Sequence, residues 1–363
     1  KPVFYFPKFF HPDPSVERQS GILQPAINDS DILGSSFHLP YFYVISKSKD
    51  LTIKPTFFED SMYMLQNEYR QINENSSLIA DFNLLQNYKP TLSNNKKSVT
   101  HLFSKYKLDL NFENFTSSTL DLSLQKVSND NYLKVFDNNL INMKLKPSSK
   151  SNLESAAILN LNNENFDFDG GIKIYDNLQE TKNSDRYQYV FPYYNFSKAP
   201  IELKYGIVNF HSIGDSRLIN TNNLKSKIVN DINYENFEII SNFGFKNNLN
   251  AYFKNVNRLS KKDQKFKSSP QAEIKSIYEV NTSLPLSKIG NQSIDYLIPK
   301  ISFRFNPSDM DDISSSSRNI NADNIFGINR LGLDETFETG KSLTIGLDYK
   351  KENLFDINKY FEF

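Results

Sequence analysis

The sequence predicts an all-β protein whose strands form an antiparallel transmembrane β-barrel. Apolar and polar residues alternate over long runs, clusters of turn-forming residues separate these runs, and the 363 residues include 20 Tyr and 30 Phe. Side chains of a strand point alternately to its two faces, so each run presents one apolar face and one polar face. No stretch keeps a helical period together with capping residues.

The alternation is clearest in the runs 106–113, 120–125 and 301–306. In the first run Leu108 and Leu110 alternate with Lys107 and Asp109. A barrel strand in a membrane turns its apolar side to lipid and its polar side to the lumen. We therefore expect five leucines to share the lipid-facing side of the sheet: Leu108, Leu110, Leu120, Leu122 and Leu124.

Turns and loops are expected at five polar or Pro-containing clusters, namely 90–97, 146–152, 180–185, 259–269 and 306–324. Many of the runs between such clusters extend over roughly 10 to 14 residues, whereas strands of soluble proteins average about 5 to 6. Long strands in unbroken succession favour an up-and-down barrel, and the aromatic content fits interface girdles. A soluble β-sandwich or a repeat protein is the alternative that the pattern alone leaves open.

Composition narrows the function. Lys and Arg number 42, as do Asp and Glu, and this zero net charge argues against a nucleic-acid partner, which needs a clustered basic surface. No run of about 18 apolar residues predicts a transmembrane helix. The absence of Cys excludes disulfides within the chain and leaves the compartment undecided.

Enzyme signatures are missing from the sequence. The four histidines are scattered without metal-ligand spacing, and no nucleophile elbow, phosphate loop or dinucleotide fingerprint occurs. We expect neither a catalytic residue nor a metal or other cofactor.

Three ordered motifs near the N-terminus are the most specific feature of the chain. R-x-S-G-x-L-x-P runs from Arg18 to Pro25, L-P-Y-F-Y from Leu39 to Tyr43, and D-x-T-I-x-P from Asp50 to Pro55. In this order, after a Pro-rich entry, they resemble the start of the barrel domain of the LPS-assembly outer-membrane protein family, LptD (OstA). The resemblance recurs at 297–305 and 324–349, whereas only alternation and order support it between about 87 and 290.

This resemblance implies a domain organisation, a location and a set of partners. Residues 1–17 would end a periplasmic β-jellyroll and its linker, and 18–363 would form the N-terminal part of an outer-membrane β-barrel whose closing strands lie outside the chain. The protein would receive lipopolysaccharide (LPS) from an LptA-type periplasmic bridge, hold an LptE-type plug lipoprotein, and insert LPS into the outer leaflet among outer-membrane lipids. The alternatives are another outer-membrane barrel (a porin or nutrient receptor) or a secreted β-rich binding protein.

Pro25 and Pro40 lie within the first two expected strands, where each removes one backbone donor. The resemblance implies that they weaken a lateral gate, a seam that opens sideways to release LPS. Gly21 and Gly34 fall in the same region, and glycines within strands mark bulges or close approaches. The residues alone allow a second interpretation, in which the prolines protect a sheet edge or mark a bend.

Two further groups are candidates for the LPS path. Acyl chains would contact the aromatic entry residues, which otherwise pack between jellyroll and barrel. Arginines that line the lumen would meet phosphates or sugars, or else form an ordinary solvated face. The candidates are Phe4, Tyr5, Phe6, Phe9, Phe10, Arg18 and Arg70.

Overall fold

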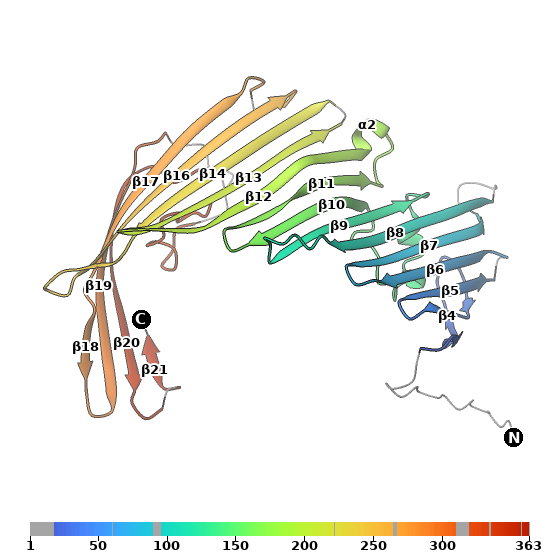
Figure 1. The fold of residues 1–363 in the computed structure, drawn as a ribbon, viewed down its shortest axis with the longest axis horizontal. Coiled ribbons are helices and arrows are strands. Elements are labelled where there is room, and N and C mark those ends of the chain that lie inside the picture. The colour runs from blue at the N-terminus through green and yellow to red at the C-terminus, as the bar shows by residue number, and fades with distance from the viewer. Residues whose placement is uncertain are drawn as a thin grey trace. The chain divides into compact units, whose positions relative to one another are not determined.

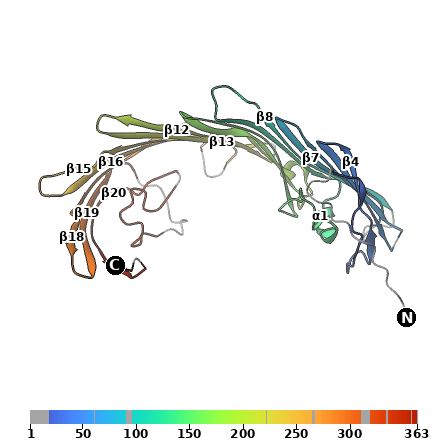
Figure 2. The ribbon, with the colours of Figure 1, turned by 60° about the horizontal axis from the view of Figure 1, so that its bottom comes forward.

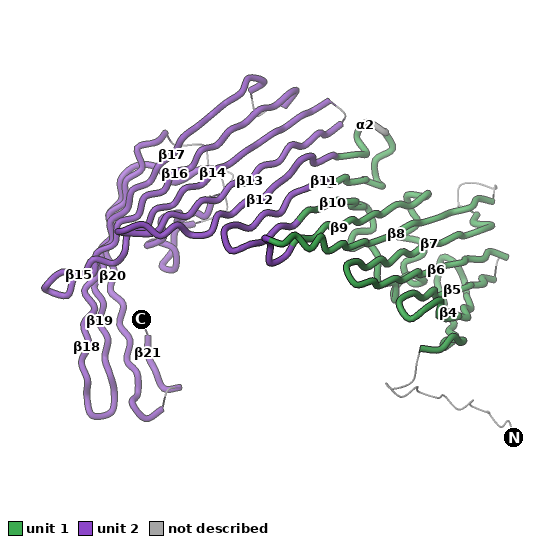
Figure 3. Tube along the Cα trace, viewed as in Figure 1, with its two compact units in different colours: residues 1–113, 118–159, 173–188 green, residues 114–117, 160–172, 189–363 purple. Residues whose placement is uncertain are grey.

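The computed structural model describes residues 18–59, 61–89, 96–220, 222–263, 267–309, 319–333, 335–356 and 358–362. Nearly all of its regular structure is β-strand (Figure 1). The chain divides into two compact units, which are coloured separately in Figure 3. Unit 1 comprises 1–113, 118–159 and 173–188, and unit 2 comprises 114–117, 160–172 and 189–363.

Unit 1 contains nine short or medium strands and three single-turn helices within its described residues. The strands are β1 (Gly21–Ile22), β2 (Ala26–Asn28), β3 (Ser36–His38), β4 (Tyr41–Ser46), β5 (Lys49–Phe58), β6 (Tyr63–Ile72), β7 (Ser76–Tyr88), β8 (Lys97–Asp109) and β9 (Ser117–Val127). The helices are α1 (Tyr132–Val135), the 3-10 helix η1 (Asn138–Leu140) and α2 (Asn183–Arg186). The strands β10 (Asn152–Asn163) and β11 (Phe166–Asn177) are each divided between the two units, and Ser117 at the start of β9 belongs to unit 2.

Neighbouring strands of unit 1 pair in antiparallel fashion from β4 through β9. The register places Asp50, Thr52 and Lys54 of β5 opposite Arg70, Glu68 and Gln66 of β6, so polar side chains line one face. The other face carries partly exposed apolar residues such as Leu65, Phe82 and Leu102. Residues of the same parity share a face across the strands. One face is therefore bare and largely apolar, whereas the other combines polar residues with buried apolar ones such as Met64, Leu85 and Phe103.

Segment 128–151, which contains α1 and η1, packs on the polar face (Figure 2). We call this the covered face of unit 1 and the opposite one its bare face. Tyr132, Leu133, Phe136 and Leu140 of the segment are at most 1% exposed and join a core with strand residues, among them Met64. The core of unit 1 therefore lies between the sheet and this segment.

Unit 2 contains long strands that also pair antiparallel. They are β12 (Tyr187–Leu203), β13 (Gly206–Ile219), β14 (Asn223–Asn236), β15 (Ile239–Ile240), β16 (Lys246–Lys261), β17 (Gln271–Ser283), β18 (Leu286–Ile289), β19 (Ser293–Asn306), β20 (Gly340–Asn353) and β21 (Tyr360–Glu362). The pairings run β13–β14–β16–β17–β19–β20, with β15, β18 and β21 as short additional strands.

Residues 319–333 and 335–339, which precede β20, cover one face of unit 2. Glu335 accepts hydrogen bonds from Lys227 Nζ at 2.8 Å and from Arg258 Nη2 at 2.9 Å. Burial disfavours the charged carboxylate, but these two cations outweigh burial and hold the pKa of Glu335 below its usual range. Arg304 of β19, 3% exposed, donates to the carbonyl of Ile328 at 2.9 Å. Ion pairs thus hold the segment where unit 1 uses mainly apolar contacts.

These observations confirm the predicted antiparallel all-β fold. Each helix among the described residues is at most four residues long, and none of them is long and apolar enough to cross a membrane. The pairings of the described residues do not close the sheet. Three predicted turn clusters overlap a strand by one residue, at Lys97 of β8, Asn152 of β10 and Asn306 of β19. A fourth boundary was further off: Leu259 to Lys261 belong to β16, because Ser260 and Lys261 still pair with Lys225 and Leu224 of β14.

The register also places the predicted leucines. Leu120 lies opposite Leu108, Leu122 opposite Tyr106 and Leu124 opposite Ser104, so four of the five leucines, all but Leu110, share the bare face of unit 1. Leu110 lies beyond the end of β8. Ser123, between two of these leucines, lies opposite Lys105 on the other face.

If the bare face meets lipid, Leu122→Arg places a charge among acyl chains, at a cost of roughly 2 to 4 kcal/mol near the bilayer midplane. Ser123→Arg places the same charge on the polar face. We expect Leu122→Arg to lower the yield of folded protein in the membrane far more than Ser123→Arg, as measured by heat-modifiable gel migration. Equal yields from the two variants would show that the faces are assigned incorrectly.

Candidate functional site

The first hairpin of unit 1 is broken on both of its strands. β1 pairs with β4 through Gly21–Phe42 and Ile22–Tyr41, and β2 pairs with β3 through Ala26–His38 to Asn28–Ser36. Between these two short ladders, three residues on one strand (23–25) lie opposite two on the other (39–40). A bulge of this kind bends a strand and leaves residues unpaired.

Pro25 and Pro40 lie inside this break. Pro25 directly precedes β2, and Pro40 directly precedes β4. Neither residue has a backbone N–H, so neither can donate a hydrogen bond to the ladder. The Leu23 amide donates to the Pro40 carbonyl at 2.8 Å, and the Leu39 amide donates to the Pro55 carbonyl at 3.3 Å. Among the described residues, β1 and β2 each pair on one side only, which makes the broken hairpin an edge of the sheet.

The two glycines of the region differ from each other. Gly21 lies in β1 opposite Phe42, with open space where a Cβ would stand. Gly34 lies in the turn between β2 and β3 rather than in a strand, and its φ of +69° favours glycine. A Cβ there would also lie 2.8 Å from Glu59 Oε2. Gly34 therefore shapes the turn of the broken hairpin.

Arg18 and Arg70, both predicted as LPS-path residues, converge on one carboxylate. Asp50, whose side chain is 3% exposed, accepts from Arg70 Nε at 2.6 Å and pairs with Arg18 Nη2 at 2.9 Å. Both guanidinium groups lie over the ring of Phe42, at 5.9 Å and 5.8 Å from its centroid. We call these four residues the arginine cluster; it ties the start of β1, through β4 and β5, to β6.

A buried hydrogen-bond chain lies farther along the covered face. Asn83 Nδ2 donates to the Tyr132 hydroxyl at 2.8 Å, and this hydroxyl lies 2.8 Å from His101 Nδ1. His101 Nε2 lies 2.7 Å from Asp81 Oδ1, and Gln66 Nε2 donates to Asp81 Oδ2 at 2.8 Å. Burial raises the pKa of Tyr132, and the Asp81 charge raises it further, so the phenol stays protonated.

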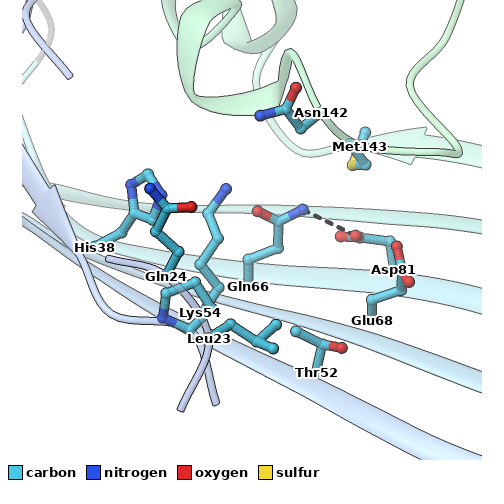
Figure 4. Close-up of a pocket in the computed structure, with 11 residues that line it drawn as sticks. Leu23, Gln24, His38, Thr52, Lys54, Gln66, Glu68, Asp81, Asn142 and Met143 are labelled. Carbon is cyan, nitrogen blue, oxygen red and sulfur yellow. Dashed lines mark hydrogen bonds between the residues drawn. The ribbon is translucent and has the colours of Figure 1, made fainter. Parts of the chain in front are cut away.

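A polar cavity of about 340 Å³ lies between the broken hairpin and this buried chain (Figure 4). Leu23 and Pro40 line it from the hairpin, and Asn142 and Met143 line it from the covering segment. Its remaining lining residues are Gln24, His38, Thr52, Lys54, Gln66, Glu68 and Asp81. All of them belong to unit 1.

The sequence therefore found part of this site. The aromatic candidates Phe4, Tyr5, Phe6, Phe9 and Phe10, like the whole predicted jellyroll end 1–17, lie outside the described residues. Asp50 and Phe42 stood in the quoted motifs without a role, and the Asp81–His101–Tyr132 chain was missed. Alternation along β5 to β8 was the available signal for the strand residues, since it assigns every second residue of a strand to the same face. Only the register shows that one face is shared by Asp50, Gln66, Asp81 and His101.

Comparison with known proteins identifies relatives of one kind. The chain is 26% identical over 165 residues to the LPS-assembly protein LptD of Idiomarina loihiensis, a match that covers 46% of this chain and 20% of the relative. It is 27% identical over 186 residues to LptD of Legionella pneumophila strain Lens, covering 49% and 22%. With LptD of Ectopseudomonas mendocina it shares 33% identity over 75 residues, covering 21% and 8%. The chain is related to LptD proteins.

These matches span about a fifth of the length of the first relatives. No protein-family model matches the chain. Among solved structures, a bacterial polysaccharide outer membrane secretin and OmpT, an outer membrane protein of Vibrio cholerae, each align at 8% identity with a TM-score of 0.28. They cover 96% and 95% of this chain and 100% and 96% of their own. The relationship to LptD proteins, together with the apolar bare face, indicates the outer membrane.

The arginine cluster yields a test of its own. Arg70 is 27% exposed and Arg18 51% exposed, so Arg70 is the better shielded partner of Asp50. Arg70→Met leaves the buried carboxylate with one solvated partner and should destabilise the fold by about 1 to 3 kcal/mol. Arg18→Met removes a mostly solvated pair and should cost less than about 1 kcal/mol. Urea-induced unfolding of the full-length protein in lipid vesicles measures both, and equal losses would contradict this ranking.

Proposed function

We propose that this chain is the N-terminal barrel part of an LptD-type translocon, which receives LPS from a periplasmic bridge and inserts it into the outer leaflet through a lateral gate. The broken first hairpin is the observation that carries the proposal. It lies at a sheet edge, and its two ladders contain only two and three residue pairs. The break between these ladders contains one proline on each strand. The relationship to LPS-assembly proteins supplies the substrate.

The physical requirement comes from LPS itself. Its acyl chains belong in the bilayer, whereas its sugars and phosphates must cross in water. A closed barrel keeps these two environments apart, so the wall has to open sideways for an amphiphile to leave. A sheet with one apolar face and one polar face provides both environments, and a weakly paired edge provides a place for them to meet.

The broken hairpin also has the right strength for a gate. Each ordinary backbone hydrogen bond contributes only about 0.5 to 1.5 kcal/mol net. Two missing donors therefore change the opening equilibrium of an edge strongly, while they change the stability of a whole barrel little. The arginine cluster crosses from β1 to β6 on the covered face, and it would hold the opened hairpin to the remaining sheet.

The proposed translocon has two protein partners and catalyses no covalent reaction. The relationship to LptD proteins supports an LptE-type plug lipoprotein in the lumen and an LptA-type bridge on the jellyroll, both as parts of the proposed translocon. The aromatic residues from Phe4 to Phe10 would contact acyl chains on their way to the gate. No covalent step is proposed for this protein.

A porin is the second candidate function, because segment 128–151 folds onto the covered face as a constriction loop would. The contacts that segment 128–151 makes with the strands favour the translocon instead. Tyr132, Leu133 and Phe136 form a dry core with the strands, whereas a porin constriction needs opposed charge clusters around open water. A porin also has no need of a broken first hairpin.

The gate is tested by restoring its donors. The double variant Pro25→Ala/Pro40→Ala of the full-length protein should fold, reach the outer membrane and bind its lipoprotein. It should deliver LPS at least about tenfold more slowly, because a bias of about 1.4 kcal/mol toward the paired edge reduces an open population tenfold. Surface LPS labelling and permeability to large antibiotics measure this delivery.

Pro299→Ala is the matched control, because Pro299 lies within β19 between paired neighbours and also lacks a strand donor. It should leave LPS delivery unchanged. Loss of folding in the double variant would assign Pro25 and Pro40 a structural role. Normal LPS delivery and normal permeability in the double variant would contradict a gating role for these two residues.

A further inference from the structure

The polar cavity beside the broken hairpin contains an acceptor that the described chain leaves without a donor. Gln66 is 5% exposed, and its Oε1 has no hydrogen-bond partner among the described residues. A buried amide oxygen without a donor is costly, and such groups are normally satisfied by protein, water or ligand. The cavity that Gln66 lines, about 340 Å³ in volume, lies at the lower end of the range for small-molecule sites, about 300 to 1,000 Å³.

The buried chain fixes the direction of this acceptor. Asn83 donates to the Tyr132 hydroxyl, so the hydroxyl donates its own proton to His101 Nδ1. His101 therefore carries its proton on Nε2 and donates it to Asp81. Asp81 accepts at its other oxygen from Gln66, which requires the Gln66 NH₂ group to face Asp81. The Gln66 carbonyl oxygen then points away from Asp81, as Figure 4 shows.

The neighbouring groups determine which ligand fits. Lys54 lies opposite Gln66 across the β5–β6 pair, and its ammonium uses one of its three donors on the Asn139 carbonyl, at 3.2 Å. Glu68 adds a carboxylate, and Thr52 adds a hydroxyl. The lining therefore offers both donors and acceptors, and it contains one ammonium, that of Lys54, against the carboxylates of Glu68 and Asp81. A free phosphate would be repelled by these two carboxylates, whereas hydroxyl groups can both donate and accept.

We propose that this cavity binds one neutral sugar ring, with Gln66 Oε1 accepting from a sugar hydroxyl and Lys54 Nζ donating to one. Leu23 and Met143 supply apolar surface for the carbon face of the ring. The proposal rests on the proposed function, because the sugar would belong to LPS held beside the gate. Gln66 and Lys54 are then specificity residues for the saccharide part of the substrate.

The test measures binding of a phosphate-free oligosaccharide, prepared from LPS by removal of its acyl chains and phosphates, to the full-length protein with its lipoprotein in detergent. Gln66→Leu keeps the volume of the side chain but removes the acceptor together with the NH₂ group that donates to Asp81, and the Kd should rise about tenfold. Asn67→Leu, one residue along β6 and on the bare face, is the matched control and should leave the Kd unchanged. Inorganic phosphate at millimolar concentration should not compete.

A second variant protects the test against misfolding. Lys54→Met keeps the aliphatic stem and removes the donor, and it should also raise the Kd about tenfold while heat-modifiable migration stays normal. Wild-type affinity in folded Gln66→Leu or Lys54→Met would overturn the proposal. Competition by phosphate, or an equal loss in Asn67→Leu, would overturn it too.

Separate experiments test the source of the sugar and distinguish failure of the cavity proposal from failure of the proposed function. A photo-crosslinking residue in place of Leu23 should capture intact LPS in growing cells, and capture of saccharide without lipid would overturn LPS as the source. If the oligosaccharide does not bind while the wild-type protein still delivers LPS, the cavity proposal fails and the translocon stands. If the oligosaccharide binds while the protein delivers no LPS, the translocon fails and the binding site stands.

Discussion

Backbone pairing is the constraint on which this structure depends. A hydrocarbon environment offers no water to an unpaired N–H or C=O group, so a sheet in a membrane must satisfy its backbone along the whole strand. From β5 to β9 the described ladders run over long, continuous stretches, with one irregularity between β7 and β8. The first hairpin departs from this rule twice, at Pro25 and at Pro40. A departure at the place where pairing matters most is expected at a functional site.

The covered faces explain how such a sheet keeps its form near a weak edge. In unit 1 segment 128–151 contributes an apolar core and a buried chain through Tyr132, His101 and Asp81. In unit 2 the segment before β20 is held by Glu335 and other ionic partners. Each unit thus gains packing contacts on its covered face, where lipid would supply none. The arginine cluster extends this support to the broken hairpin of unit 1.

The sequence predicted the fold well because a period of two is a local signal that the register preserves. Leu120 and Leu122 share a face with Leu108 and Tyr106 for that reason. The convergence of Arg18 and Arg70 on Asp50 could not be predicted, since it depends on which residues lie opposite each other across β4 to β6. Segment 128–151 was missed because its contacts are long-range. The proposed role of Pro25 and Pro40 in a gate came from a resemblance, and the structure adds the break in which both prolines lie.

Amide hydrogen exchange of the full-length protein in lipid bilayers tests the central claim most directly, because it reports local opening of each ladder. The account predicts that the amides of β1 to β4 exchange at least about tenfold faster than those of β6 to β8. Equal protection of the first hairpin and of β6 to β8 would contradict a weak edge at Pro25 and Pro40.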